Sequence, residues 1–271
     1  MLNNKIILIP NYNGEKYVRE TIEKFKIFLP NWTIIVVDDK SNDNSINIIK
    51  TLDCILIQKS TNGGYASSVN RGLNYINKKF DINHTFVLIA NSDVIPIKEL
   101  NLQLEDVMHN VQKPFIVGFI EKGFMPLKPT EYEKLPGFLY ILSLDVLNKI
   151  GYLDERFYMF GEENDYFFRA KLKKINLFQC NLIVDQLSFK SFSDPKKLVF
   201  YSVRNSLFLE IKWKRYFKFI LKAFYFILFF IILRLFVNKS NPSNRRLTSI
   251  SYIEGMLTCL IAIFSVRKLM R

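Results

Sequence analysis

Asn91 and Asp93 stand two residues apart just after an apolar run, Thr85 to Ala90, in a chain of 271 residues. A run of apolar and β-branched residues of this length is typical of a strand that is covered on both faces. Covered strands belong to α/β sheets, in which ligands bind beyond the carboxyl ends of the strands. A carboxylate at such a place can hold a hard divalent cation and, through the cation, a diphosphate. Asp93 is therefore a candidate metal ligand.

A second acidic pair, Asp38 and Asp39, follows the β-branched stretch 33–37. Uracil and thymine carry a ring N–H between two carbonyls, and a carboxylate at a strand end can accept a hydrogen bond from that N–H. The same pair also fits the polar end of a strand followed by a turn at 41–43, with no ligand at all. The pattern alone leaves both interpretations open.

The segment Glu162-Glu163-Asn164-Asp165 gathers three carboxylates within four residues. A carboxylate can act as a general base that takes the proton of an attacking hydroxyl group. Taken by itself, the segment is more simply an acidic helix start, because the helix dipole favours negative charge there.

The elements that would position these groups follow a regular order. Apolar strands at 5–9, 33–38 and 85–90 alternate with helical patterns at 16–28 and 45–51. This alternation predicts βαβ units, whose parallel strands end at one common crevice. A Gly-rich turn at 62–64 precedes a helix that we expect to begin near residue 66. Glycine allows close approach of the backbone to a ligand, and a helix N-terminus favours phosphate.

Several short motifs occur in a fixed order along the chain. They are Ile9-Pro10-Asn11-Tyr12-Asn13, Val36-Val37-Asp38-Asp39, Asn62-Gly63-Gly64-Tyr65-Ala66 with Val69-Asn70-Arg71-Gly72, Asn91-Ser92-Asp93, and Gly161-Glu162-Glu163-Asn164-Asp165. As an ordered set they resemble the family 2 inverting glycosyltransferases of the GT-A fold, and most of all the bacterial rhamnosyltransferase-like members. The resemblance covers about residues 3–215. It implies an α/β fold with a Rossmann-like mixed sheet and a nucleotide-diphosphate sugar as donor.

The resemblance also implies roles for single residues at the nucleotide. Asp39 would accept the hydrogen bond from the base, while Pro10, Asn11 and Tyr12 would line the base and the ribose. The other positions that the resemblance places in the nucleotide site are Gly64, Asn70 and Asn91.

For the chemistry, the resemblance implies that Asp93 binds Mg²⁺ or Mn²⁺ and that Glu163 is the general base. Glu162 and Asp165 would orient the substrate or brace Arg169. Arg204 lies in a Tyr-x-x-Arg-Asn motif at 201–205 and would contact the diphosphate. An arginine on the protein surface is the alternative interpretation of Arg204.

The metal motif departs from the family pattern in two ways. Asn91 stands where the family commonly has an aspartate, and the stretch 182–188 lacks the histidine that often completes the site. Asp185 and Gln186 are the candidate substitutes, since neither of the two histidines in the chain, His84 and His109, is placed to reach the site. A weaker metal requirement is the expected consequence.

The net charge of +13 is concentrated at one end of the chain. Residues 196–271 contain 15 of the 38 Lys and Arg residues but only two acidic residues, Glu210 and Glu254. The same segment holds apolar runs at 216–237 and 255–266, and charged residues interrupt the first of them. Its uninterrupted core, 223–233, is short of the roughly 20 residues that cross a bilayer. Snorkelling of Lys222 and Arg234 would lengthen the apolar segment, so a span at 216–237 stays an alternative to a helix that lies on the membrane. Cationic, apolar helices suit an anionic membrane surface better than nucleic acid.

The sequence also predicts how the chain divides into a catalytic domain and an appendage. We expect a catalytic domain at 1–200, divided at about residue 95 into nucleotide-sugar and acceptor halves, and a helical appendage at 201–271. The appendage either lies on the inner face of the cell membrane or packs as a hairpin against the catalytic domain or a second subunit, as in a homodimer. Scattered cysteines and no visible signal peptide predict a cytoplasmic protein.

The function expected from these observations is transfer of a hexosyl group to a hydroxyl of a lipid-linked or growing polysaccharide. A dTDP-linked rhamnosyl donor is the first candidate, and a UDP-linked hexose is the second. The competing hypothesis is a non-catalytic protein that binds sugar nucleotides or acts as a scaffold in a membrane assembly. Intact candidates for metal ligand and base, Asp93 and Glu163, favour the enzyme.

Overall fold

The computed structural model describes residues 3–121, 125–129, 135, 137–182, 185–186 and 195–236, together with positions 254 and 257. The chain divides into two compact units. The first unit comprises residues 1–158 and 162–191, and the second comprises 159–161 and 192–271.

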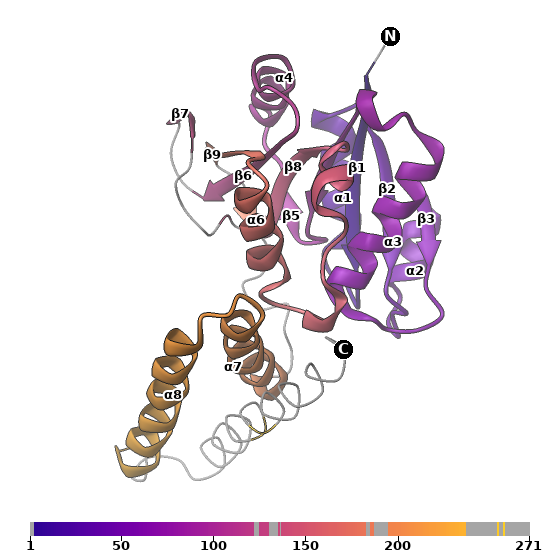
Figure 1. Ribbon diagram of the computed structural model, residues 1–271. Coiled ribbons are helices and arrows are strands. Elements are labelled where there is room, and N and C mark those ends of the chain that lie inside the picture. The colour runs from indigo at the N-terminus through magenta and orange to yellow at the C-terminus, as the bar shows by residue number, and fades with distance from the viewer. Residues whose placement is uncertain are drawn as a thin grey trace. The chain divides into compact units, whose positions relative to one another are not determined.

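The first unit is built on an eight-stranded sheet with the strand order β3-β2-β1-β4-β8-β6-β9-β7 (Figure 1). Its strands are β1 (Asn4–Asn11), β2 (Thr33–Asp38), β3 (Ile55–Gln58), β4 (Thr85–Ala90), β6 (Phe115–Glu121), β7 (Met125–Pro129), β8 (Leu139–Ser143) and β9 (Asn176–Leu182). Strands β3, β2, β1 and β4 are mutually parallel, whereas β8 pairs antiparallel with both β4 and β6. The sheet is therefore mixed; the sequence pattern predicts β1, β2 and β4 of its parallel half but not β3.

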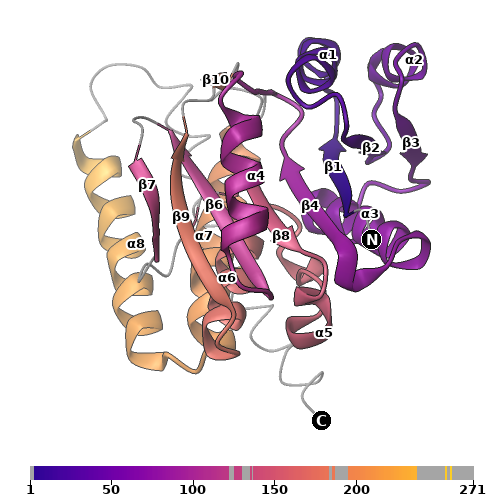
Figure 2. The ribbon, with the colours of Figure 1, turned by 90° about the horizontal axis from the view of Figure 1, so that it is seen from above.

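Helices cover both faces of this sheet because the central strands are apolar on both sides. On β1, Ile7 and Ile9 belong to one hydrophobic cluster and Ile6 and Leu8 to the other. The first cluster includes residues of α1 (Val18–Phe28), α2 (Ser45–Lys50) and α4 (Leu100–Asn110). The second includes residues of α3 (Gly64–Lys79), α5 (Val146–Ile150) and α6 (Glu162–Leu172), on the opposite side of the sheet in Figure 2.

The contact between α3 and β1 is unusually close. A Cβ atom at Gly72 would lie 2.2 Å from a methyl carbon of Leu8, so only glycine allows this helix to approach the strand so closely. The close packing fixes where the N-terminus of α3 lies relative to the carboxyl ends of the parallel strands.

Short elements complete the first unit. A two-residue strand, β5 (Val94–Ile95), pairs antiparallel with β10 (Asp185–Gln186). Single 3₁₀ turns occur at η1 (Ile82–His84) and η2 (Glu155–Phe157).

The second unit contains two described helices, α7 (Pro195–Lys212) and α8 (Tyr216–Phe236). Val203 and Leu207 of α7 pack against apolar residues of α8. Buried Glu210 forms an ion pair with Arg215, with 2.7 Å between Oε2 and Nε, and accepts a hydrogen bond from Lys222 Nζ at 2.5 Å, and so joins the two helices at their connection. The helices thus form an antiparallel pair with an ionic link near the turn.

One side of α8 is apolar and exposed. Its large exposed side chains are Tyr216, Phe217, Ile220, Leu221, Phe224, Tyr225 and Leu228, which we call the α8 stripe. No helix in the described part of the chain combines the length and the apolarity that crossing a membrane requires.

Most of the predicted strands and helices occur in the structure. The strands expected near 5–9, 33–38 and 85–90 are present, as are the helices expected at 16–28 and 45–51, and the helix expected near 66 begins at Gly64. The helix expected to begin at about residue 200 begins earlier, at Pro195. The apolar run at 255–266 falls outside the described residues except for position 257.

Candidate active site

The candidate residues lie beyond the carboxyl ends of three neighbouring parallel strands. Asn11 ends β1 and pairs in register with Asp38 at the end of β2. Asn91 directly follows β4, the neighbour of β1 on its other side. Because parallel strands end at the same edge of a sheet, these strand ends come together there, as the βαβ pattern predicts.

Asp38 is occupied in bracing the loops at this edge. Its carboxylate accepts hydrogen bonds from Asn11 Nδ2 at 2.8 Å and from the Ser41 backbone and hydroxyl at 2.9 and 2.6 Å. The amide oxygen of Asn11 is buried and has no hydrogen-bond partner in the structure. A Cβ at Gly14 would lie 2.2 Å from that oxygen, so glycine is required beside it. Asp38 is therefore structural, while Asn11 presents an unused acceptor.

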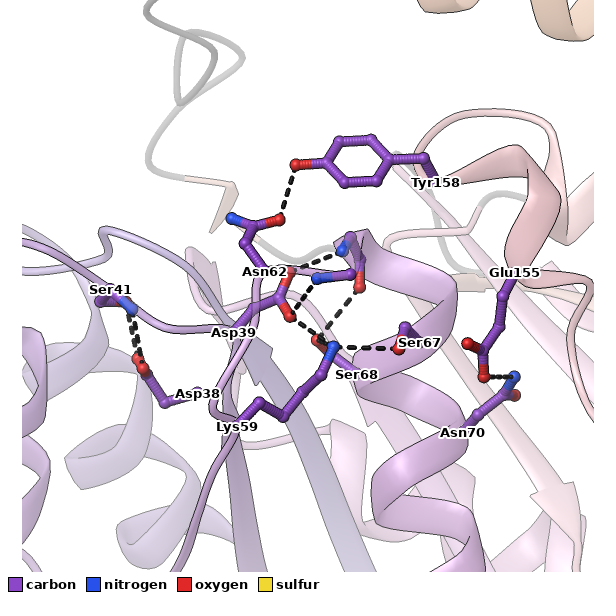
Figure 3. A network of polar contacts seen from close by, with 12 residues as sticks. Asp38, Asp39, Ser41, Lys59, Asn62, Ser67, Ser68, Asn70, Glu155 and Tyr158 are labelled. Atoms are coloured by element: carbon purple, nitrogen blue, oxygen red, sulfur yellow. Dashed lines mark hydrogen bonds and ion pairs between the residues drawn. The ribbon is translucent and has the colours of Figure 1, made fainter.

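Asp39 is almost fully buried and binds the start of α3 (Figure 3). Its carboxylate accepts hydrogen bonds from the backbone N–H groups of Gly63 at 3.0 Å and Gly64 at 2.7 Å, and it forms an ion pair with Lys59. The first N–H groups of a helix lack intrahelical partners, so Asp39 caps α3 from a different element. Lys59 is a site residue that the sequence analysis missed, because no motif singled it out.

Gly64 lies in the left-handed region, with φ of +83°. A Cβ there would be 2.1 Å from the carbonyl oxygen of Tyr158, and the Tyr158 hydroxyl donates a hydrogen bond to Asn62 Oδ1 at 2.6 Å. The Gly-rich turn is therefore clamped against the segment that leads to the acidic helix. Glycine is required at position 64 by the positive φ and by the close approach of the Tyr158 carbonyl.

The side-chain amide of Asn70 is occupied by hydrogen bonds to the backbone of Leu153 and to the side chain of Glu155. Its amide donates to Leu153 O at 2.9 Å and to Glu155 at 2.8 Å, and its oxygen accepts from Leu153 N at 2.9 Å. A pocket of about 340 Å³ lies beside it along α3. This pocket is lined by Lys59, Ser67, Asn70, Arg71, Asn74, Tyr152 and Glu155. Asn70 thus shapes the wall of a pocket, and its contact with a nucleotide stays a prediction.

The other residues expected at the base lie on the β1 loop. Pro10 is buried at the end of β1, and the ring of Tyr12 is 48% exposed. An exposed aromatic ring at a strand end is available for stacking on a base.

The end of β4 carries the candidate metal ligands. Asp93 is buried with 4% of its surface exposed, and the side-chain oxygen of Asn91 is buried and has no hydrogen-bond partner within the described part of the chain. Strand β10 brings the backbone of Asp185 and Gln186 beside β5, directly after Asp93. Within the described residues no three His, Cys, Asp or Glu side chains form a metal-binding group. A carboxylate and an amide oxygen nevertheless fit Mg²⁺, which commonly uses one or two carboxylates together with substrate phosphates and water.

The acidic residues at the start of α6 have different surroundings. Glu162 is 4% exposed and Glu163 is half-buried. Burial, followed by the neighbouring Glu163 carboxylate, raises the pKa of Glu162 well above its ordinary value. Burial likewise raises the pKa of the nearby Tyr65 and Tyr140 hydroxyls, with smaller contributions from the glutamates. Glu162 therefore keeps its proton to higher pH than an exposed glutamate does.

Asp165 serves a structural role at this helix. It is fully buried and accepts a hydrogen bond from Arg169 Nε at 2.9 Å. Arg169 in turn donates to the backbone carbonyls of Ile150 and Tyr152. Of the two roles expected for Asp165, bracing Arg169 is the one that these contacts support.

The residues before α6 have a constrained backbone. Tyr158, Phe160 and Gly161 have φ of 62°, 62° and 95°. Positive φ is rare for bulky residues and often marks functional sites. Within the second unit, buried Asn205 donates to the carbonyls of Met159 at 2.6 Å and Phe160 at 2.7 Å. Asn205 was part of the motif at 201–205, but no role had been predicted for it.

Arg204, the neighbour of Asn205, lies half-buried on α7. Its guanidinium carbon is 5.6 Å from the centre of the Tyr201 ring, a cation–π distance. The diphosphate contact expected for Arg204 stays a prediction.

Comparison with known proteins agrees with this geometry. The chain is 25% identical over 224 residues to the low-salt glycan biosynthesis hexosyltransferase Agl10 of Haloferax volcanii, covering 70% of this chain and 71% of Agl10. Among solved structures, the mannosyltransferase PcManGT from Pyrobaculum calidifontis, in complex with GDP-Man and Mn²⁺, is 11% identical with a TM-score of 0.59, covering 96% of this chain and 88% of that one. S. aureus TarS is 20% identical with a TM-score of 0.51; the match covers 77% of this chain but only 39% of TarS.

The model of the family "Glycosyl transferase family 2" matches residues 6–176, which is well over half of the chain. The matched span contains the parallel strand ends, the capped start of α3 and the acidic start of α6. The chain therefore belongs to glycosyl transferase family 2 and is a glycosyltransferase with the GT-A fold.

Proposed function

We propose that the protein transfers a hexosyl group, with rhamnosyl the first candidate, from a nucleotide-diphosphate sugar to a hydroxyl of a lipid-linked or growing polysaccharide. The anomeric carbon is inverted in this reaction. The observation that carries the proposal is the set of acceptors at the strand ends. The carboxylates of Asp39 and Asp93 lie there together with two buried amide oxygens, of Asn11 and Asn91, that have no hydrogen-bond partner among the described residues. Buried unpaired acceptors in a native protein call for a ligand or water.

The donor binds with its base against Asp39 and Tyr12. Asp39 accepts the N–H of uracil or thymine, which supports a dTDP- or UDP-linked donor. PcManGT holds GDP-Man on the same fold, so the fold itself does not select the base. The selectivity must come from the residues around Asp39.

Asp93, with the amide oxygen of Asn91, would hold Mg²⁺ or Mn²⁺. When bound, such a cation neutralises the charge of the leaving diphosphate. The Mn²⁺ in the PcManGT complex supports a divalent ion in this fold. The ligand set is small, so we expect affinity for the metal to depend strongly on the bound nucleotide.

Glu163 takes the proton of the acceptor hydroxyl as its oxygen attacks the sugar. The two neighbouring glutamates are distinguished by burial. Glu162 is almost fully buried, and burial followed by the Glu163 carboxylate raises its pKa well above its usual value, whereas Glu163 is only half-buried and therefore more accessible to the acceptor hydroxyl. Glu162 orients Glu163 or the substrate.

The second unit associates with the inner face of the cell membrane. The α8 stripe supplies apolar side chains, and the excess positive charge of residues 196–271 attracts anionic lipids. This location brings a lipid-linked acceptor to the enzyme and suits synthesis of a surface polysaccharide, in line with the similarity to the glycan biosynthesis hexosyltransferase Agl10.

The alternative is a protein that binds sugar nucleotides without turning them over. A panel of dTDP-rhamnose, UDP-hexoses and GDP-mannose, each with Mg²⁺ or Mn²⁺, separates the two. Thermal shift measures donor binding, and release of the nucleoside diphosphate in the presence of membrane glycolipid measures turnover. Donor-specific stabilisation with nucleotide release supports the transferase. Stabilisation without release under any acceptor condition would favour the non-catalytic alternative, and no stabilisation by any donor would refute both.

A further inference from the structure

The carboxylate of Asp39 already has three hydrogen-bond donors around it. Gly63 N and Lys59 Nζ both contact Oδ1, and Gly64 N contacts Oδ2 (Figure 3). An ionised carboxylate offers about four lone-pair directions. About one direction, on Oδ2, is therefore left for a ligand.

The ammonium group of Lys59 has an acceptor for each of its protons in the same network. Its ammonium group contacts Asp39, Ser67 Oγ at 3.0 Å and Ser68 Oγ at 3.4 Å, and its side chain is 11% exposed. An ammonium group has three protons, so three acceptors satisfy it. Lys59 therefore acts on a nucleotide through Asp39 and does not itself contact the base.

The nucleobases differ in how many N–H donors they present side by side. Uracil and thymine present one ring N–H, flanked by carbonyls, whereas guanine presents a ring N–H next to an amino group. Guanine would need two acceptor directions on the carboxylate, and a second donor without a partner is costly when buried. Cytosine and adenine present a ring nitrogen that is itself an acceptor and would face the carboxylate unfavourably.

We propose that Lys59 is a specificity-determining residue: by occupying one lone pair of Asp39, it limits the site to bases with a single N–H donor. The proposal rests on the proposed function, in which Asp39 contacts the base, and adds the residue that sets the selectivity. It predicts that the site selects uracil or thymine over guanine because Asp39 has only one free lone pair. This selection adds to any selection by the size of the base.

The test uses two purine nucleotides of nearly equal size. Inosine diphosphate presents one ring N–H beside a carbonyl, and guanosine diphosphate adds the amino group. Calorimetric titration of the full chain with UDP, IDP and GDP, with Mg²⁺ present, gives the ratios of affinity.

We expect IDP to bind about tenfold more tightly than GDP, which corresponds to one unpaired buried donor. In Lys59→Met the freed lone pair can accept the amino group, so the ratio of IDP to GDP affinity should fall towards one.

Arg71→Ala is the matched control, because Arg71 lines the same pocket but has no hydrogen bond or ion pair with Asp39 in the described residues. Its IDP to GDP ratio should equal that of the wild type. Equal affinities of the wild type for IDP and GDP would overturn the inference even if Lys59→Met failed to fold. A ratio that survives in Lys59→Met, with all nucleotides weakened alike, would reduce Lys59 to a structural role.

Two further results are informative. Binding of UDP with no binding of either purine by the wild type or Lys59→Met would also overturn the inference, because size would then be the discriminator. Failure of the wild type to bind any nucleotide would instead refute the proposed function, so the two failures are distinguishable.

Discussion

Asn70 and Leu153 exchange two hydrogen bonds, from Asn70 Nδ2 to Leu153 O and from Leu153 N to Asn70 Oδ1, each of 2.9 Å. The side-chain amide of Asn70 thus pairs with the backbone of Leu153 as a residue of a neighbouring strand would. It attaches α3, whose start is held by Asp39, to the segment that leads towards the acidic helix.

Asn70→Ala should therefore lower the free energy of unfolding by about 1–3 kcal/mol for each buried backbone group that it leaves unpaired. Denaturant or thermal unfolding measures the loss. Asn74→Ala is the control, since Asn74 lies one turn further along α3 and no hydrogen bond of its side chain occurs in the described residues. Equal stability of the two variants would contradict a structural role for Asn70.

Asp93→Ala should abolish the metal-dependent part of donor binding while the protein stays folded. The reason is that Asp93 is the buried carboxylate at the end of β4, beside the unpaired amide oxygen of Asn91. Titration of the donor with Mg²⁺ and with EDTA measures the difference. Glu99→Ala, an exposed carboxylate directly before α4, is the control. Donor affinity that responds to metal equally in Asp93→Ala and wild type would remove Asp93 from the site.

Glu163→Gln keeps the size of the side chain but removes its basic lone pair at neutral pH. We expect kcat to fall by about a hundredfold or more, because general bases typically contribute that much. Donor affinity should hardly change, since the base acts in the transition state. Glu162→Gln should affect kcat less. An active Glu163→Gln beside an inactive Glu162→Gln or Asp165→Asn would place the base elsewhere in the cluster.

Stability against pH provides a separate test of Glu162. Its folded-state pKa is raised above the unfolded value, so the folded protein binds more protons and is relatively stabilised at pH below the unfolded pKa. This stabilisation is lost as pH rises towards the folded pKa. Glu162→Gln stays neutral, so its melting temperature should exceed that of the wild type at pH 7–8 and lose this advantage near pH 4. A difference independent of pH would mean that Glu162 ionises normally.

The α8 stripe gives a prediction about the membrane. Replacing Ile220 and Phe224 with Asp should release the full chain from vesicles that contain phosphatidylglycerol, because both side chains are more than half exposed on α8. Sedimentation with vesicles at low and high salt measures binding. Leu102→Asp, at an equally exposed apolar position of α4, should bind as the wild type does. Undiminished binding of the α8 variant would locate the membrane contact elsewhere.

Strands β1, β2 and β4 of the parallel half could be predicted from the sequence because each contains a run of buried apolar residues. Asn11 ends β1, Asp38 ends β2, and Asn91 directly follows β4. Strands β6, β7 and β9 could not, since they include polar residues or proline and are defined by pairing between distant segments, parallel between β6 and β9 and antiparallel between β7 and β9.

The candidate site was predictable to a similar extent. Acidic residues at strand ends identify the location, but the partners of each carboxylate depend on contacts across the fold. Asp38 and Asp39 are adjacent in sequence, yet one braces a loop and the other caps α3. Lys59 stands in no pattern that marks chemistry, and Asn205 belongs to the motif at 201–205 without a role predicted for it, so only their contacts reveal what they do.

The close approach of Gly64 to the carbonyl of Tyr158 links two positions that lie far apart in the chain. A related protein could carry a side chain at position 64 only if the backbone around 158 followed a different path. The two sites should therefore vary together during divergence, with glycine retained wherever this loop is retained. Engineering of this region could replace the Tyr158 side chain but would have to keep the path of its backbone opposite position 64.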